Sequence, residues 1–136
     1  MIAHSLHQAL MLTRANNNLK GLILDSSPDL KCTNLLCEKV TLPCLCRLEF
    51  ALTKINSSSL QILSLCHNDL TELPPTIQSV TSLEELYLTG NKLSNLPPSL
   101  SHLSQLRVLD IQETSIRDLP DFILKLPSLR DIRRDS

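Results

Sequence analysis

The chain has 136 residues, of which 42% are hydrophobic and 20% charged, and its formal net charge is -1. These values are typical of a globular domain, and the near-neutral charge argues against a nucleic-acid-binding protein. Since no apolar run reaches the roughly 20 residues of a membrane helix, we expect neither nucleic acid nor membrane as a partner. Leucine is by far the commonest residue type, whereas aromatic residues make up only 2% of the chain, a bias that is typical of repeat proteins.

The N-terminal segment, residues 1–18, carries Ile2, Leu6 and Leu10 at roughly helical spacing and ends in three asparagines. This pattern predicts an amphipathic helix. A stack of repeats exposes apolar residues at its end, so we expect this helix to act as a cap. The segment has no basic start, and His4 interrupts its apolar residues, unlike a secretory signal. We therefore expect a cytoplasmic protein, with a secreted effector delivered into host cells as the alternative.

The next segment, residues 19–59, contains two irregular strand patterns. One starts at Leu19 as Leu-x-x-Leu-x-Leu, and the other starts at Leu45 as Leu-x-x-Leu-x-Phe. The next strand pattern begins at Leu60, so soon after Leu45 that we expect the second unit to lack most of its return segment. In chain order, the second strand is expected to lie between the first strand and the regular repeats.

A strict 23-residue repeat occupies residues 60–128. Its first copy reads Leu-x-x-Leu-x-Leu-x-x-Asn-x-Leu-x-x-Leu-Pro-x-x-Ile-x-x-Val from Leu60, and equivalent copies start at Leu83 and Leu106. A fourth copy starts at Leu129 and gives a terminal partial repeat over residues 129–136. We expect this last strand to be a weakly covered edge. A monomer is expected, with an end-to-end dimer through the C-terminal edge as the alternative.

Each position of the repeat has a physical role. The Leu-x-Leu pair places two side chains on one face of a short strand, because strand side chains alternate. The amide of the following Asn can bond the backbone of neighbouring turns, which predicts a column of Asn68, Asn91 and Thr114. Proline closes the turn, and apolar residues three apart predict a short helical or 3₁₀ return.

This pattern resembles the leucine-rich repeat family, specifically the 23-residue Leu-Pro-x-x-Ile/Leu class of Scribble, Erbin and the Ras-associated scaffolds. The resemblance implies an α/β solenoid, a curved horseshoe with short parallel strands on its concave face and helical or 3₁₀ returns on its convex face. The cap over residues 1–18 would then be followed by repeats over residues 19–136. Members of this class are intracellular scaffolds, so the resemblance also implies binding to another protein.

The residue types give little material for catalysis. With two glycines, the chain lacks a phosphate-binding loop, and it contains no nucleophile-elbow motif. Its five cysteines leave free thiols, zinc and disulfides as options, and we favour free thiols because the spacing of Cys and His is unlike that of a zinc finger. Cys66 is expected to point outward, and we favour a small residue tolerated on a shallow surface over a thiol that is oxidised or contacts a ligand. We expect no enzyme activity, no metal and no cofactor.

The strand face opposite the leucines is the candidate binding site, because the repeat does not dictate its residue types. Tyr87 lies at its centre, and tyrosine is enriched at binding hot spots. The expected protein-binding residues are Ile62, Ser64, Cys66, Glu85, Tyr87, Thr89, Val108, Asp110 and Gln112.

Further residues of this solvent-exposed face are expected from the neighbouring strands, at positions equivalent to those of the nine residues above. They are Gly21, Ile23, Asp25, Arg47, Glu49, Ala51, Asp131 and Arg133. Because carboxylates outnumber arginines over the whole face, a partner with a basic element is favoured.

Two classes of function compete. The first is a scaffold or signalling adaptor, or a microbial effector of the same repeat type, that binds a partner protein on the concave face. The second is a structural solenoid fragment of a larger receptor or sensor, which the weak C-terminal edge favours.

Overall fold

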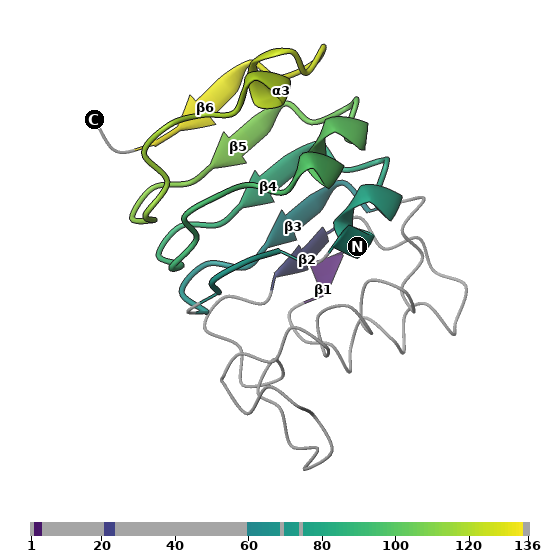
Figure 1. The fold of residues 1–136 in the computed structure, drawn as a ribbon. Helices are drawn as coiled ribbons and strands as arrows, with labels where there is room; N and C mark the ends of the chain where they lie inside the picture. Colours follow the sequence, from purple (N-terminus) through teal and green to yellow (C-terminus); the bar gives the residue numbers. More distant parts are fainter. Residues whose placement is uncertain (1, 4–20, 24–59, 69, 74, 135–136) are drawn as a thin grey trace.

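A computed structural model of the chain describes residues 2–3, 21–23, 60–68, 70–73 and 75–134. In this part of the chain, six strands form one parallel sheet in the order β1-β2-β3-β4-β5-β6 (Figure 1). The strands are β1 (Ile2–Ala3), β2 (Gly21–Ile23), β3 (Ile62–Ser64), β4 (Glu85–Tyr87), β5 (Val108–Asp110) and β6 (Asp131–Arg133).

The repeat period sets the register of the sheet. Leu63 pairs with Leu86, and Leu86 pairs with Leu109, so the central leucines of three successive strands lie in line. The same line continues to Leu22 on one side and to Ile132 on the other. The predicted stacking of the repeats is therefore confirmed.

Short helices return the chain on the other side of the core. They are η2 (Pro75–Ser79), η3 (Pro98–His102) and α3 (Asp121–Leu124), and Figure 1 shows them stacked beside the sheet. Pro98 lies in the first turn of η3, where its fixed φ suits the helix and a missing N–H costs nothing. Pro97 and Pro120 precede η3 and α3 in extended conformation. The predicted helical and 3₁₀ returns are confirmed.

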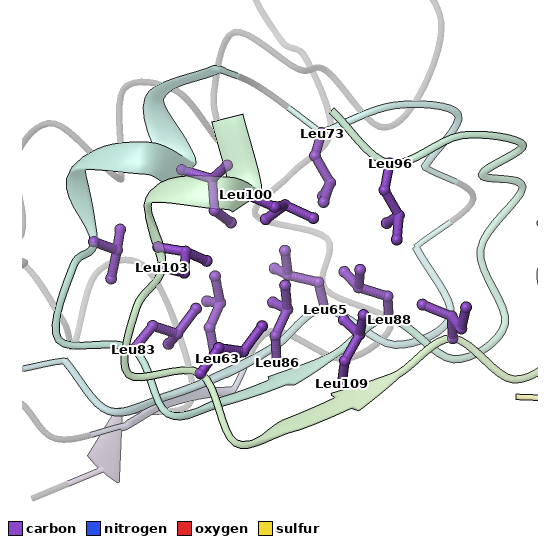
Figure 2. Packing of buried hydrophobic residues seen from close by; sticks show 14 of the residues in the cluster. Leu63, Leu65, Leu73, Leu83, Leu86, Leu88, Leu96, Leu100, Leu103 and Leu109 are labelled. Atoms are coloured by element: carbon purple, nitrogen blue, oxygen red, sulfur yellow. The ribbon is translucent and has the colours of Figure 1, made fainter. Parts of the chain in front are cut away.

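The core fills the space between strands and returns. Figure 2 shows strand leucines such as Leu86 meeting return leucines such as Leu100, and both are fully buried. Leucines from successive coils make one continuous hydrophobic cluster. Because each coil buries its leucines against its neighbours, the stack is stable as an array rather than as separate units.

The predicted polar column lies at the turn after each strand. The Oδ1 atom of Asn91 accepts bonds from the backbone N–H groups of Asn68 and Leu70 in the preceding coil, both at 3.0 Å. Its Nδ2 group donates to the carbonyls of Leu65 and Leu88, both at 2.9 Å. Asn91 therefore joins two coils through four bonds.

The other two members of the column bond the carbonyl at the end of their own strand. Asn68 donates to the Leu65 carbonyl at 2.9 Å, within its own coil. The Thr114 hydroxyl donates to the Ile111 carbonyl at 2.7 Å and accepts from the Ile116 N–H, also within its own coil. The shorter threonine side chain thus satisfies its own turn but does not reach the preceding coil as Asn91 does.

The residue before each member of this column has left-handed backbone conformation. The φ angles are 58° at His67, 76° at Gly90 and 55° at Glu113. Only glycine adopts this conformation without steric cost. Gly90 is also covered by the imidazole of His67, so that a Cβ there would collide with the ring.

The N-terminal prediction is wrong at its first described residues. Ile2 and Ala3 form strand β1, which pairs with Gly21 and Leu22 of β2, instead of starting a helix. The backbone N–H and C=O groups of β1 are satisfied by pairing with β2. The spacing of apolar residues within one segment does not reveal a partner strand elsewhere in the chain. The remainder of the expected helix, residues 4–18, lies outside the described residues.

The order predicted for the irregular segment is also wrong. β2 pairs directly with β3, with Gly21 opposite Ile62, so the strand expected near Leu45 does not separate them. The paired residues Gly21 and Ile62 are much farther apart in the sequence than the next pair, Ile62 and Glu85, which are separated by one repeat period. The two expected units that start at Leu19 and Leu45 are therefore not successive strands of the sheet. The expected face residues Asp25, Arg47, Glu49 and Ala51 lie outside the described residues.

The last coil is less covered than the coil one repeat before it. Leu129 and Ile132 are partly buried, whereas their equivalents one repeat earlier, Leu106 and Leu109, are 0% exposed. β6 pairs only with β5 among the described strands. Across the described ranges, no helix has the length and hydrophobicity to cross a membrane.

Candidate protein-binding face

The face of the sheet that points away from the leucines is called the strand face here. Its first row runs across the strands through Ile62, Glu85, Val108 and Asp131, and its second row runs through Ser64, Tyr87, Asp110 and Arg133. The third row, Cys66, Thr89 and Gln112, follows the strand ends. At these ends the hydrogen bonding between neighbouring strands continues, because the Leu65 N–H donates to the Tyr87 carbonyl and the Leu88 N–H donates to the Asp110 carbonyl. All nine residues expected to bind protein therefore share this face.

The strand face is not uniformly exposed to solvent, contrary to the expectation of a solvent-exposed face. Ser64 and Asp110 are each only 7% exposed, and Gly21 is also buried. Gln112 is exposed, and the other predicted site residues are intermediate. Ser64 and Asp110 flank Tyr87 in the second row, and strands only about 4.8 Å apart let a large ring shield its short neighbours.

Tyr87 and Glu85 form a tight pair on β4. The Tyr87 hydroxyl donates to Oε1 of Glu85 at 2.6 Å. This hydrogen bond, together with burial and the negative charge of Glu85, raises the pKa of Tyr87 to about 12. The phenol is therefore a neutral donor held in one direction by the carboxylate.

Arg133 reaches the same region from β6. Its Nε group donates to Oδ2 of Asp131 at 3.0 Å, and both side chains are about half exposed. Its guanidinium carbon lies 6.0 Å from the centre of the Tyr87 ring, within the range of a cation–π interaction. The bond to Asp131 and the charge of this carboxylate raise the pKa of Arg133 above its usual value.

Asp110 lies between Tyr87 and Arg133 in the second row. Its Oδ1 atom accepts a 3.1 Å bond from the backbone N–H of Gln112. Among the described residues, no donor is hydrogen-bonded to its second carboxylate oxygen. Asp110 is thus a buried carboxylate with remaining acceptor capacity, flanked by a ring and a guanidinium.

Arg133 and Asp131 were not among the nine residues expected to bind protein, although they lie on the same face. Their positions follow from the repeat, since Asp131 and Arg133 lie one period after Val108 and Asp110. The signal was therefore present in the sequence. The contact of Arg133 with the Tyr87 ring two strands away could not be predicted, because the repeat pattern does not determine side-chain direction.

Cys66 lies near the other side of the face as a half-buried thiol outside any disulfide of the described residues, and its Sγ atom lies 3.6 Å from Oγ of Ser64. The other four cysteines lie outside the described residues, and for them the preference for free thiols stays a prediction. In the described part of the chain, no three His, Cys, Asp or Glu side chains gather in a way that could hold a metal ion.

A separate groove of about 340 Å³ lies at the turns between two successive coils. Glu72 and Asn95 are its longest polar side chains, and Leu73 and Leu96, which are 4% exposed, belong to the hydrophobic core. This open groove is formed by turn residues and does not include the strand face.

The two rows that lie within the strands have an excess of negative charge. Glu85, Asp110 and Asp131 contribute three carboxylates and Arg133 one guanidinium, which gives a net charge of -2 over β3 to β6. This part of the face therefore attracts cationic groups.

The comparisons with known proteins agree with this architecture. The family model described as leucine rich repeat matches residues 58–116 and again residues 81–133. Comparison with curated proteins gives no match. Repeats of this family generally mediate protein–protein interaction and are non-catalytic. Since the matched residues span more than half of the 136-residue chain and fold into stacked coils with one parallel sheet, the protein belongs to the leucine-rich repeat family.

Proposed function

We propose that this protein is a non-catalytic interaction module that binds a partner protein on its concave strand face, as a cytoplasmic scaffold or signalling adaptor. The 23-residue Leu-Pro-x-x-Ile/Leu pattern supports placing it in the class of Scribble, Erbin and the Ras-associated scaffolds. A monomer offers the whole strand face to one partner.

The observation that carries this proposal is the position of Tyr87. Its half-buried ring lies in the middle of a row of side chains that the leucine framework does not require. The 2.6 Å bond to Glu85 holds the phenol in place before any partner arrives. A pre-oriented aromatic group loses little conformational freedom on binding, which is typical of an interface anchor.

The charge of the face indicates the partner's chemistry. The excess of two negative charges in the two strand rows favours a partner with a basic element. Such complementarity raises the association rate and rejects acidic competitors.

Affinity capture from a lysate of the source cell tests the proposal. The wild-type chain is compared with a triple variant, Glu85→Gln, Tyr87→Ala and Asp110→Asn, and with Leu124→Ala, which changes a 63% exposed leucine on α3. We expect a partner that is retained by the wild type and Leu124→Ala but lost by the triple variant. Equal capture by all three proteins would contradict the assignment of this face.

Tyr87→Ala is the single-site version of the experiment. It should weaken capture of the same partner and lower the melting temperature much less than loss of a core leucine does, because the ring lies outside the leucine core. A large fall in melting temperature would indicate a mainly structural role for the ring.

The last coil favours a second candidate function. Leu129 and Ile132 are only partly buried, as expected if these coils extend a larger solenoid in a receptor or sensor. The purified chain tests this alternative by light scattering and thermal unfolding. A monodisperse monomer that melts cooperatively supports a module, a defined dimer supports pairing through the C-terminal edge, and aggregation supports the structural extension.

A further inference from the structure

We propose that the partner protein inserts an arginine side chain between Tyr87, Asp110 and Asp131. In the free chain, Arg133 occupies this place. This inference rests on the proposed function and specifies the group that the strand face recognises. The partner's guanidinium would lie over the Tyr87 ring and bond the carboxylates, and Arg133 would swing aside into solvent.

The first step of the argument is that the site is already complementary to a guanidinium. Arg133 stands 6.0 Å from the Tyr87 ring centre, and its Nε bonds Oδ2 of Asp131 at 3.0 Å. A planar cation that stacks on a ring while it bonds a carboxylate is the arrangement typical of arginine recognition. The fold therefore holds one example of the interaction that it would make with a partner.

The second step is that Asp110 has more acceptor capacity than the chain uses. Asp110 is 7% exposed, and its described hydrogen bond is the one that Oδ1 accepts from Gln112. Arg133 uses its Nε group on Asp131, two residues before it in the chain. A buried carboxylate with an unused oxygen is a strong acceptor for a second, better oriented guanidinium.

The third step is that Arg133 is held weakly enough to be displaced. Its side chain is 48% exposed and that of Asp131 is 47% exposed. Exposed ion pairs contribute little to stability because water screens them. Arg133 lies on β6, in a coil whose Leu129 and Ile132 are only partly buried. Displacing it therefore leaves the core in place.

A titration with a short oligo-arginine peptide tests the proposal. Tyr87 is the single tyrosine and the chain has no tryptophan, so its intrinsic fluorescence reports directly on the site. We expect saturable binding that is tighter for oligo-arginine than for oligo-lysine of equal length, and no binding of oligo-glutamate. Equal affinity for arginine and lysine would overturn the proposal, because general charge attraction then explains the binding.

Matched variants separate displacement from net charge. Arg133→Ala should bind oligo-arginine about two- to five-fold more tightly than Arg130→Ala, which removes the same charge from an exposed residue directly before β6. Asp110→Asn should bind more weakly than Asp118→Asn, which removes a carboxylate from an exposed turn. If Arg133→Ala binds no better than Arg130→Ala, Arg133 is not a competitor and the inference is wrong.

The two proposals fail in different ways. Capture of a partner that depends on Glu85, Tyr87 and Asp110, without selective oligo-arginine binding, would retain the binding face and reject arginine recognition. Selective oligo-arginine binding with the expected Arg133→Ala gain, but capture that is insensitive to the triple variant, would support the arginine site and reject this face as the main partner surface.

Discussion

The Tyr87 hydroxyl donates a 2.6 Å hydrogen bond to Oε1 of Glu85, two residues earlier on strand β4. Both side chains lie on the same side of the sheet because strand side chains alternate. The bond needs the neutral phenol, since a phenolate beside the carboxylate would lose the donor and add charge repulsion. The pair therefore stabilises the protonated form of Tyr87.

Ionisation of Tyr87 should follow from this pair. Absorbance titration of the single tyrosine should give a pKa of about 12 in the folded chain. Glu85→Gln should lower it toward the ordinary value of 10.0, because both the hydrogen bond to the carboxylate and its charge favour the neutral phenol. A value of 10.0 in the folded wild type would contradict the observed contact.

The same shift makes stability depend on alkaline pH. The folded pKa of Tyr87 lies above its unfolded value, so its contribution is fully present below pH 10.0 and is lost as pH rises to about 12. Denaturant unfolding over this range should show a smaller alkaline loss in Tyr87→Phe, which cannot ionise. An identical loss in both proteins would exclude Tyr87 as the source.

Leu86→Ala should destabilise the stack by about 2–5 kcal/mol, because it removes a fully buried side chain and leaves a cavity. Leu124→Ala provides the same chemical change at a position that is 63% exposed, and should cost much less. Urea unfolding of both variants measures the difference. Similar free energies of unfolding for the two variants would contradict the continuous core.

Asn91→Ala should cost about 2–4 kcal/mol, since it leaves two backbone N–H groups and a carbonyl without their side-chain partner. Thr114→Ala should cost only about 1 kcal/mol, because its two bonds stay within one turn. Chemical unfolding of the two alanine variants gives the comparison. A larger loss for Thr114→Ala would show that bonds between coils are not the main contribution of the column.

Gly90→Ala should destabilise by about 1–2 kcal/mol through its positive φ alone, and further through collision with the His67 ring. His67→Ala should restore the second part only, so the double variant should be more stable than the two single losses predict. A double-mutant cycle by thermal unfolding measures this coupling. Strict additivity would mean that the ring moves aside without cost.

The regular repeats could be predicted because their pattern is local and identical in each copy. Leu63, Leu86 and Leu109 occupy the same place in each period, so the registry of β3, β4 and β5 follows from equal spacing alone. The polar column at Asn68 and Asn91 follows in the same way, because an amide after a strand has backbone groups within reach.

The irregular part could not be predicted in this way. Nothing in the spacing of Ile2 indicates that it pairs with Gly21, or that Gly21 pairs with the distant Ile62. Such pairings depend on which remote segment satisfies a strand's backbone groups, which is a property of the assembled sheet. The periodic pattern near Leu45 was sufficient to suggest a strand but not its neighbours.

The repeat, its period, the buried leucine positions and the residues that share the strand face all follow from the spacing of residue types along the chain. The burial of Asp110 and the position of Arg133 over Tyr87 depend on how the coils pack against one another. Alternation assigns a side chain to a face, but its exposure and direction depend on neighbours from other strands. The chemistry of the binding face is therefore set by contacts between coils, whereas the framework that carries it is set within each coil.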